Sequence, residues 1–182
     1  GGVGEQSAQD DPVQESLRAG EHALHFVVDD AVDLEGVRRR FFVGRTDVPL
    51  DAVGHRQARL LAERLPGPFT AAYASPLRRA RDTALPVHDP AEVVDALAEL
   101  DQGALEGLDG PTALGRYPEF FAAFQADPER ARVPGGESLG ELRDRALEAV
   151  HRIARAHGPG ERVALFTHQM VISSLTCTAL GR

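Results

Sequence analysis

Apolar segments of strand length alternate with amphipathic segments of helix length along this chain from residue 41 onward. Residues 69–74 form a short, largely apolar segment that ends before Pro76, and residues 163–166 form a second one. Apolar runs without polar alternation are typical of strands that are covered on both faces, as in a parallel sheet. The alternation therefore predicts an α/β domain: a three-layer sandwich with a mostly parallel central sheet and helices on both faces.

Capping residues and helix breakers predict where the main helices begin and end. Asp51 can cap a helix with apolar residues at helical spacing, and residues 66–68, Pro-Gly-Pro, end it. Ser138 and Glu141 form a capping box at the start of a longer amphipathic helix, which residues 158–160 end. Two further helices are expected, one through Arg79 and Thr83 and one over residues 169–180.

The negative charge of the chain is concentrated at its beginning. The formal net charge is −8, and residues 1–36 hold nine acidic residues and one arginine. Acidic and basic residues balance in the remainder, so no basic face for a nucleic acid is visible. Residues 1–22 are acidic and poor in apolar side chains, which predicts a disordered acidic tail followed by a single domain over residues 23–182.

Cysteine content and hydrophobicity predict a cytoplasmic protein. Cys177 is the only cysteine, so an internal disulfide is excluded and a reducing compartment is expected. The chain has no basic segment followed by an apolar one at its beginning, and no run of about 18 apolar residues. We therefore expect no membrane partner.

Polar residues follow three of the expected strands. Acidic residues 29–30 follow a strand-like segment at 23–28, residues 75–79 follow the second strand, and residues 167–168 follow the third. Ligands of open α/β sheets bind outside the carboxyl ends of the strands. The free N–H groups of the helix that begins after His168 would favour an anion there. The sequence therefore predicts an anion pocket at this edge of the sheet.

Several short motifs resemble those of the histidine phosphatase (phosphoglycerate-mutase-like) superfamily. The motifs occur in family order over residues 41–180, each in the expected secondary structure, which makes the resemblance specific. They are Gly-Arg-Thr-Asp-Val-Pro-Leu at 44–50 with Gly54 and Gln57-Ala58, Ser-Pro-Leu-Arg-Arg-Ala at 75–80 with Thr83-Ala84, Glu99 with Gly103 and Glu106-Gly107, Pro-Gly-Gly-Glu-Ser at 134–138, and Thr167-His168. The resemblance implies the histidine phosphatase fold. Family members continue with a further strand, so it also implies a domain truncated at its C-terminus.

The resemblance assigns the chemistry to three residues. Arg79 is expected to bind a phosphate through two parallel hydrogen bonds. His168 matches the second histidine of the family, which acts in catalysis and binds the phosphoryl group. Glu99 matches the carboxyl that protonates the leaving oxygen and later activates water, with Asp101 and Glu106 as nearby alternatives.

Further residues are expected at the edge of this site. Gly44 and Arg45 are candidates for lining the phosphate pocket, whereas Arg78 and Arg81 are expected to be surface charges. The resemblance implies neither a metal nor a cofactor. The expected ligand is a small phosphorylated molecule.

The motif that carries the nucleophile of the family is not recognisable. In the family a first strand ends in Arg-His-Gly, and this histidine becomes phosphorylated during turnover. Here the strand-like segment before Gly44 ends in Val28-Asp29-Asp30. Our first interpretation is that these residues stand in place of Arg-His-Gly. Two carboxylates there would each repel a phosphate by about 4 kcal/mol at about 4 Å, for an effective dielectric constant of about 20.

Two other interpretations of the missing nucleophile remain open. Residues 18–21, Arg-Ala-Gly-Glu, have an alanine where the nucleophilic histidine would stand, although residues 12–17 before them are no apolar strand. Alternatively, His22 or His25 acts as a displaced nucleophile, although both stand at the beginning of the strand.

Two classes of function follow from these motifs. One is a phosphomonoesterase that works through a phosphohistidine and is impaired in the chain as written. The other is a catalytically inactive relative that binds a phosphorylated ligand or a protein partner through the same pocket. Within the first class a phosphatase is favoured over a mutase, because the connection over residues 85–91 leaves little room for extra substrate-recognition loops.

Overall fold

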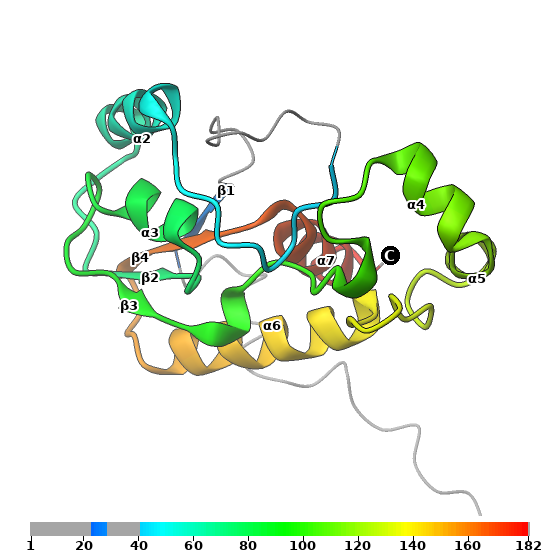
Figure 1. Cartoon of the computed structure of the whole chain (residues 1–182). Coiled ribbons are helices and arrows are strands. Elements are labelled where there is room, and N and C mark those ends of the chain that lie inside the picture. Colours follow the sequence, from blue (N-terminus) through cyan, green and yellow to red (C-terminus); the bar gives the residue numbers. More distant parts are fainter. Residues whose placement is uncertain (1–22, 29–40, 182) are drawn as a thin grey trace, which may run out of the picture.

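A parallel sheet of four strands lies at the centre of the computed structural model, which describes residues 23–28 and 41–181. The strand order is β1-β4-β2-β3 (Figure 1). The strands are β1 (Ala23–Val28), β2 (Ala71–Ala74), β3 (Glu92–Val93) and β4 (Arg162–Thr167). All three pairings are parallel, with Val28 opposite Thr167 and Ala74 opposite Phe166. The carboxyl ends of β1, β2 and β4 therefore meet at one edge of the sheet.

Helices cover both faces of this sheet, as the alternation of segments predicts (Figure 1). One face carries α2 (Ala52–Arg64) and α3 (Arg78–Ala84), and the other carries α6 (Leu139–Arg155) and α7 (Gln169–Ala179). Side chains of β4 alternate between the two layers. Ala164 and Phe166 pack with the alanines of α3, whereas Val163 and Leu165 pack against α6 and α7. The predicted three-layer α/β sandwich is confirmed.

The helix boundaries agree with their capping residues. The Asp51 side chain accepts a hydrogen bond from the Gly54 N–H at 2.8 Å, and α2 ends two residues before Pro66. At the start of α6, the N–H of Glu141 donates to the Ser138 hydroxyl and the N–H of Ser138 donates to the Glu141 carboxylate. Both orphan N–H groups of the capping box are thus satisfied, as predicted from the sequence.

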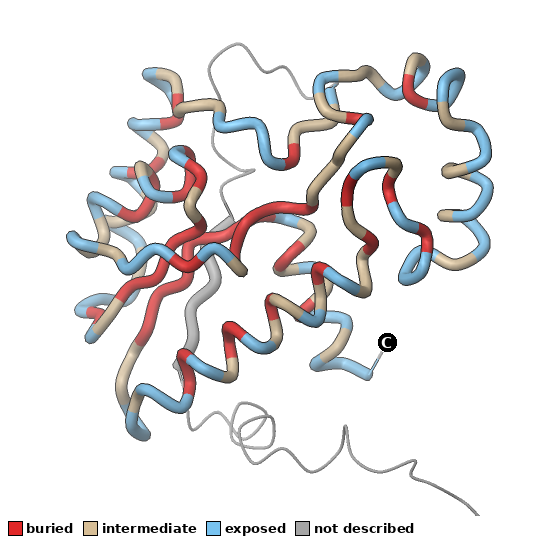
Figure 2. The backbone as a smooth tube through the Cα atoms, turned by 60° about the horizontal axis from the view of Figure 1, so that its bottom comes forward, coloured by how far each residue is buried: buried red, intermediate tan, exposed pale blue. Residues whose placement is uncertain are grey.

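Buried residues concentrate along the sheet and on the inward faces of the helices that flank it (Figure 2). On α6 the buried side chains follow helical spacing. They are Leu142, Ala146, Ala149, Val150, Ile153 and Ala154. This stripe packs against β4 and α7, which fixes the carboxyl end of β4 relative to α7.

The chain between β3 and α6 is mostly irregular. It contains the short helices η2 (Asp95–Leu97) and η3 (Gly103–Leu105), then α4 (Gly110–Arg116) and α5 (Pro118–Ala126). The helices α4 and α5 lie at the end of the molecule away from α2 (Figure 1). They are connected to the rest by aromatic contacts, such as that of Phe42 with Phe121 at 6.4 Å between ring centroids.

Some expectations concern residues outside the described part of the chain. The predicted disordered tail, residues 1–22, lies outside it, as do residues 29–40. The division into a tail and a single domain therefore stays a prediction. Among the helices of the described residues, none has the length and apolar character needed to span a bilayer.

Candidate active site

His168 lies at the carboxyl edge of the sheet, where β4 passes into α7. Its side chain is completely buried, and its Nε2 atom lies 2.7 Å from the hydroxyl of Ser75, the residue that follows β2. The Ser75 N–H donates to the carbonyl of Phe166 in β4. These contacts bring the carboxyl ends of β2 and β4 together around the histidine, as the strand-end pattern predicts.

Arg79 approaches the same edge from the first turn of α3. Its side chain is only 2% exposed, which is unusual for a charged residue. The guanidinium donates to the carbonyl oxygens of Thr46 at 2.9 Å and Gly44 at 3.0 Å. These bonds fix the orientation of its planar fork against the 44–46 turn. The neighbouring Arg78 is exposed, in agreement with its expected surface position.

Glu106 holds the 44–46 turn in place through hydrogen bonds. Its carboxylate accepts hydrogen bonds from the N–H groups of Gly44 at 3.1 Å and Arg45 at 2.6 Å, and from the Thr46 hydroxyl at 2.7 Å. Glu106 therefore organises the turn that orients Arg79. This engagement argues against Glu106 as the proton donor.

Gly44 has no space for a side chain. A Cβ atom at this position would lie 2.1 Å from the carbonyl oxygen of Leu100 and 2.6 Å from the Glu106 carboxylate. Because backbone cannot yield as a flexible side chain does, we expect Gly44→Ala to lower the free energy of unfolding by about 1–3 kcal/mol. Urea denaturation measures this change.

The control for Gly44→Ala is Gly115→Ala. Gly115 lies in α4, with nothing within 4 Å of an added Cβ, so this substitution should raise helix stability by up to about 1 kcal/mol. Equal effects of the two substitutions would show that the 44–46 turn is not tightly packed.

Glu99 is the carboxylate that contacts the helix beginning after His168. Its side chain is 5% exposed. Oε1 accepts from the Leu100 N–H at 2.7 Å, and Oε2 accepts from the Met170 N–H in the first turn of α7 at 3.3 Å. A carboxylate at a helix N-terminus is favoured by the free N–H groups and the helix dipole. The alternative Asp101 instead accepts a hydrogen bond from the Gly103 N–H.

Arg45 differs from the other candidates in its exposure and partners. Its side chain is 39% exposed, and its guanidinium lies 3.8 Å from the Glu137 carboxylate. Only its backbone joins the Glu106 contacts of the 44–46 turn. The structure therefore brings Arg79, the Gly44 backbone, Glu99 and His168 to one edge of the sheet, with Arg45 beside them.

The carboxyl end of β1 reaches the same edge, because Val28 pairs in register with Thr167. His25 pairs with Ala164, three positions earlier, which is about 10 Å back along the strand. This position does not favour His25 as a displaced nucleophile. Asp29, Asp30, His22 and residues 18–21 lie outside the described residues.

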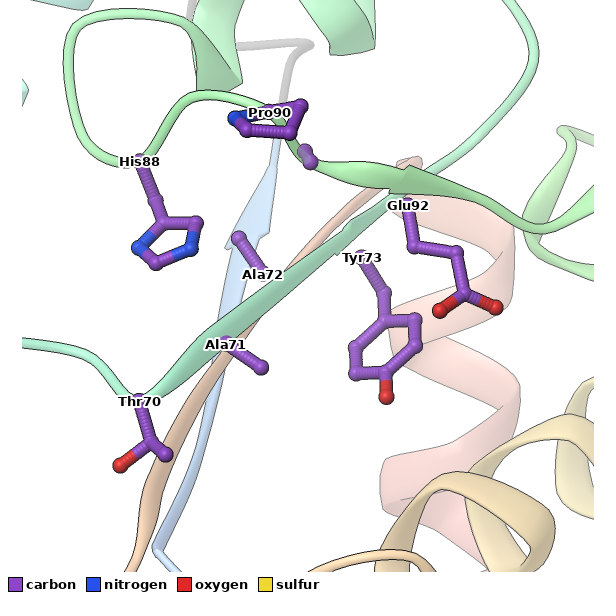
Figure 3. A pocket seen from close by; sticks show the side chains of 8 residues that line it. Thr70, Ala71, Ala72, Tyr73, His88, Pro90 and Glu92 are labelled. Carbon is purple, nitrogen blue, oxygen red and sulfur yellow. The ribbon is translucent and has the colours of Figure 1, made fainter.

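A separate pocket of about 300 Å³ lies along β2, on the side of β3 (Figure 3). Its lining side chains come from β2 and from the chain that leads into β3. They belong to Thr70, Ala71, Ala72, Tyr73, His88, Pro90, Ala91 and Glu92. None of the predicted site residues lines this pocket, so it is distinct from the candidate active site.

Several residues of the site were not singled out from the sequence. Ser75 belongs to one of the motifs without an assigned role, and the sequence predicts Glu106 only as an alternative proton donor, not as the residue that holds Gly44 and Arg45. Arg145 and Glu137 contact the segment that carries Glu99, which no local pattern indicates. Within the described residues, no three His, Cys, Asp or Glu side chains are placed to hold a metal ion.

Comparison with known proteins decides the family. The model of the histidine phosphatase superfamily (branch 1) matches residues 33–182. The chain belongs to the histidine phosphatase superfamily. The match begins after the end of β1.

Relatives of this chain within the superfamily are named as phosphatases and mutases. The metal-independent phosphoserine phosphatase of Arabidopsis thaliana is 36% identical over 140 residues, which cover 72% of this chain and 58% of that protein. Phosphoserine phosphatase 1 of Hydrogenobacter thermophilus is 29% identical over 145 residues, covering 77% and 68%. The chain spans about three fifths of the length of that Arabidopsis protein and of another Arabidopsis relative, phosphoglycerate mutase-like protein 4.

Solved structures show the same fold. The protein TTHB049 from Thermus thermophilus is 33% identical, with a TM-score of 0.67 over 87% of this chain and 85% of that chain. A putative alpha-ribazole-5'-P phosphatase from Escherichia coli is 22% identical, with a TM-score of 0.77 over 86% and 78%. The second likeness concerns the fold alone.

Proposed function

We propose that this histidine phosphatase binds a small phosphorylated molecule at the carboxyl edge of its sheet, with the phosphoryl group between Arg79 and His168. The observation that carries the proposal is the joint burial of these two side chains at the ends of β2 and β4. A buried guanidinium and a histidine at a helix N-terminus are the groups that an oxyanion needs. Gly44 and Arg45 line the rim of this site.

The reaction that the residues support is phosphomonoester hydrolysis. A nucleophilic histidine takes the phosphoryl group, while Arg79 and His168 stabilise the charge on its oxygens. Glu99 protonates the leaving oxygen and then activates the water that releases phosphate. These steps require neither a metal nor a cofactor.

We propose that this chain is impaired in the first step, the transfer of the phosphoryl group to a histidine. β1 ends beside Thr167, and we propose that the next residues in the sequence, Asp29-Asp30, stand in the place of the His-Gly of the family. Carboxylates beside a phosphoryl group repel it. The second candidate function is therefore a module that binds a phosphorylated ligand through the same pocket without turnover, and the Asp29-Asp30 sequence favours it.

Further features narrow the proposal. The short connection over residues 85–91 favours a phosphatase over a mutase, and the names of two relatives suggest phosphoserine as a first substrate to try.

Cys177, the only cysteine, favours a reducing compartment, so we propose a cytoplasmic location. The acids and bases of residues 37–182 balance, which disfavours a nucleic-acid partner.

The hydrolysis of phosphoserine, an alkyl phosphate whose leaving oxygen needs a proton, tests the impairment. A general acid contributes about 100-fold to 10,000-fold to the rate, so Glu99→Gln would slow an active enzyme by such a factor. We expect the chain and its Glu99→Gln variant to hydrolyse the ester at the same rate. A large difference between the two, or a phosphohistidine trapped by alkaline quenching, would show that a nucleophile is present.

A further inference from the structure

Arg145 binds both ends of the short segment that leads into Glu99. Its Nη1 donates to the carbonyl oxygen of Ala96 at 2.7 Å, and its Nη2 donates to the carbonyl oxygen of Glu99 at 3.1 Å. The residue projects from α6, which is 46 residues further along the chain than Glu99. One guanidinium therefore spans the backbone immediately before the proposed proton donor.

Glu137 binds both the Arg145 guanidinium and the backbone that follows Glu99. Its carboxylate accepts from Nε of Arg145 at 3.0 Å and from Nη2 at 2.6 Å. It also accepts from the Asp101 N–H at 2.9 Å, and the Glu137 N–H donates to the Asp101 carbonyl oxygen at 3.1 Å. Glu137 thus fixes the backbone just beyond Glu99.

The ion pair is held in its charged form. Burial by itself raises the pKa of Glu137, but the hydrogen bonds from Arg145 and from the Asp101 N–H outweigh burial and keep this pKa below its ordinary value. The bidentate geometry suits the planar guanidinium fork, which a lysine ammonium does not reproduce.

Residues 98–101 belong to no helix or strand, so their backbone groups have no ladder partners. Leu97 and Leu100 are buried and attach the segment to the core. Thr167 holds the segment at the Leu97 carbonyl oxygen, whereas Arg145 and Glu137 bind the Glu99 carbonyl oxygen and the Asp101 N–H on either side of Leu100.

We propose that Arg145 and Glu137 are a positioning pair that holds the Glu99 carboxylate at the first turn of α7, beside His168. The proposal rests on the proposed role of Glu99 as proton donor. A catalytic group displaced by about 1 Å can lose about 100-fold in rate. The pair therefore acts on the proton-transfer step and leaves phosphate binding unchanged.

The test compares Arg145→Ala with Arg143→Ala in the full chain. Arg143 is the matched control, because it lies on the same helix and pairs with Glu129 and Asp144 but makes none of the hydrogen bonds to the Glu99 segment. Hydrogen exchange is measured at the Leu100 and Met170 N–H groups, which both donate to the Glu99 carboxylate.

We expect Arg145→Ala to accelerate exchange at both N–H groups by at least about 10-fold, which is about 1.4 kcal/mol of local protection. Arg143→Ala should leave both rates unchanged, and neither substitution should change the Kd for inorganic phosphate. Unchanged exchange in Arg145→Ala, or equal acceleration in both variants, would overturn the proposal. These measurements need no turnover, so they decide the positioning role even if hydrolysis is never observed.

A kinetic comparison separates positioning from a purely structural role. It uses the variant with Val28→Arg, Asp29→His and Asp30→Gly, which supplies a nucleophile. Adding Arg145→Ala should lower kcat for an alkyl phosphate by about 10-fold to 100-fold at constant KM, and should affect p-nitrophenyl phosphate less, because a good leaving group needs less protonation. Equal loss for both esters would contradict the proposal.

Two further variants guard against loss of folding. Arg145→Lys keeps the charge but not the fork, and Glu137→Gln keeps the volume but not the charge. Both should raise exchange at Leu100 and Met170 by less than Arg145→Ala does. If both exchange at the rate of the unmodified chain, the ion pair has no positioning role.

Discussion

Replacement of Val28-Asp29-Asp30 by Arg-His-Gly is expected to give this chain phosphomonoesterase activity. The physical reason is the register of the sheet, in which Val28 lies opposite Thr167 and β1 ends at the edge that carries His168. In the interpretation of residues 28–30 given above, the substitution removes two carboxylates that would repel a phosphate and supplies a histidine that can accept the phosphoryl group. The remaining groups for transfer, Arg79, His168 and Glu99, are buried at this edge.

A second substitution in the Arg-His-Gly variant, Glu99→Gln, measures how much of its rate depends on the proton donor. Glu99→Gln should lower its kcat by about 100-fold to 10,000-fold, a difference that we do not expect in the unmodified chain. The matched control has Ala in place of His at position 29, and it should neither turn over nor form a phosphoenzyme. Activity of this control would place the nucleophile elsewhere, and inactivity of the Arg-His-Gly variant would refute the interpretation of residues 28–30.

The sequence predicted the central layers of this fold because their signals are local. The apolar segments at 69–74 and 163–166 became the buried strands β2 and β4, although β2 begins only at Ala71. The capping residues Asp51 and Ser138 lie within three residues of the N–H groups that they bind. Such short-range patterns are readable in a single chain.

Elements without a buried face were not predicted. The strand β3 has only two residues, both exposed, and α5 contributes no fully buried residue. β3 is too short to show an alternation, and the phenylalanines of α5, although they stand at helical spacing, are only partly buried. Their positions follow from contacts with distant parts of the chain, such as the Phe42 and Phe121 rings.

In the candidate site too, residues that stand in short motifs could be predicted, whereas residues placed by distant contacts could not. Arg79, Glu99 and His168 could be named because each stands in a short motif after a strand or beside one. The residues that hold these side chains in place could not be recognised as such, since Glu106 is 62 residues from Gly44 and Arg145 is 46 residues from Glu99. Hydrogen bonds over such separations leave no periodic signal in the sequence.

Arg79→Ala is expected to abolish measurable phosphate binding. The Arg79 guanidinium is buried and oriented by the carbonyl oxygens of Gly44 and Thr46, so its loss removes the main positive charge of the proposed site. Removal of one partner of a buried, hydrogen-bonded charge pair costs about 2–5 kcal/mol, which corresponds to a Kd raised by about 30-fold or more. Arg79→Lys should recover only part of this loss, because it offers no fork.

The most direct test of the account is a calorimetric titration of inorganic phosphate into the chain, Arg79→Ala and Arg78→Ala. Arg78 is the matched control, because it is adjacent and exposed, and the alanine variant keeps the backbone N–H that donates to Asp47. We expect the chain and Arg78→Ala to bind phosphate with the same Kd, and Arg79→Ala not to bind it. Equal binding by all three proteins, or no binding by the unmodified chain, would contradict this expectation.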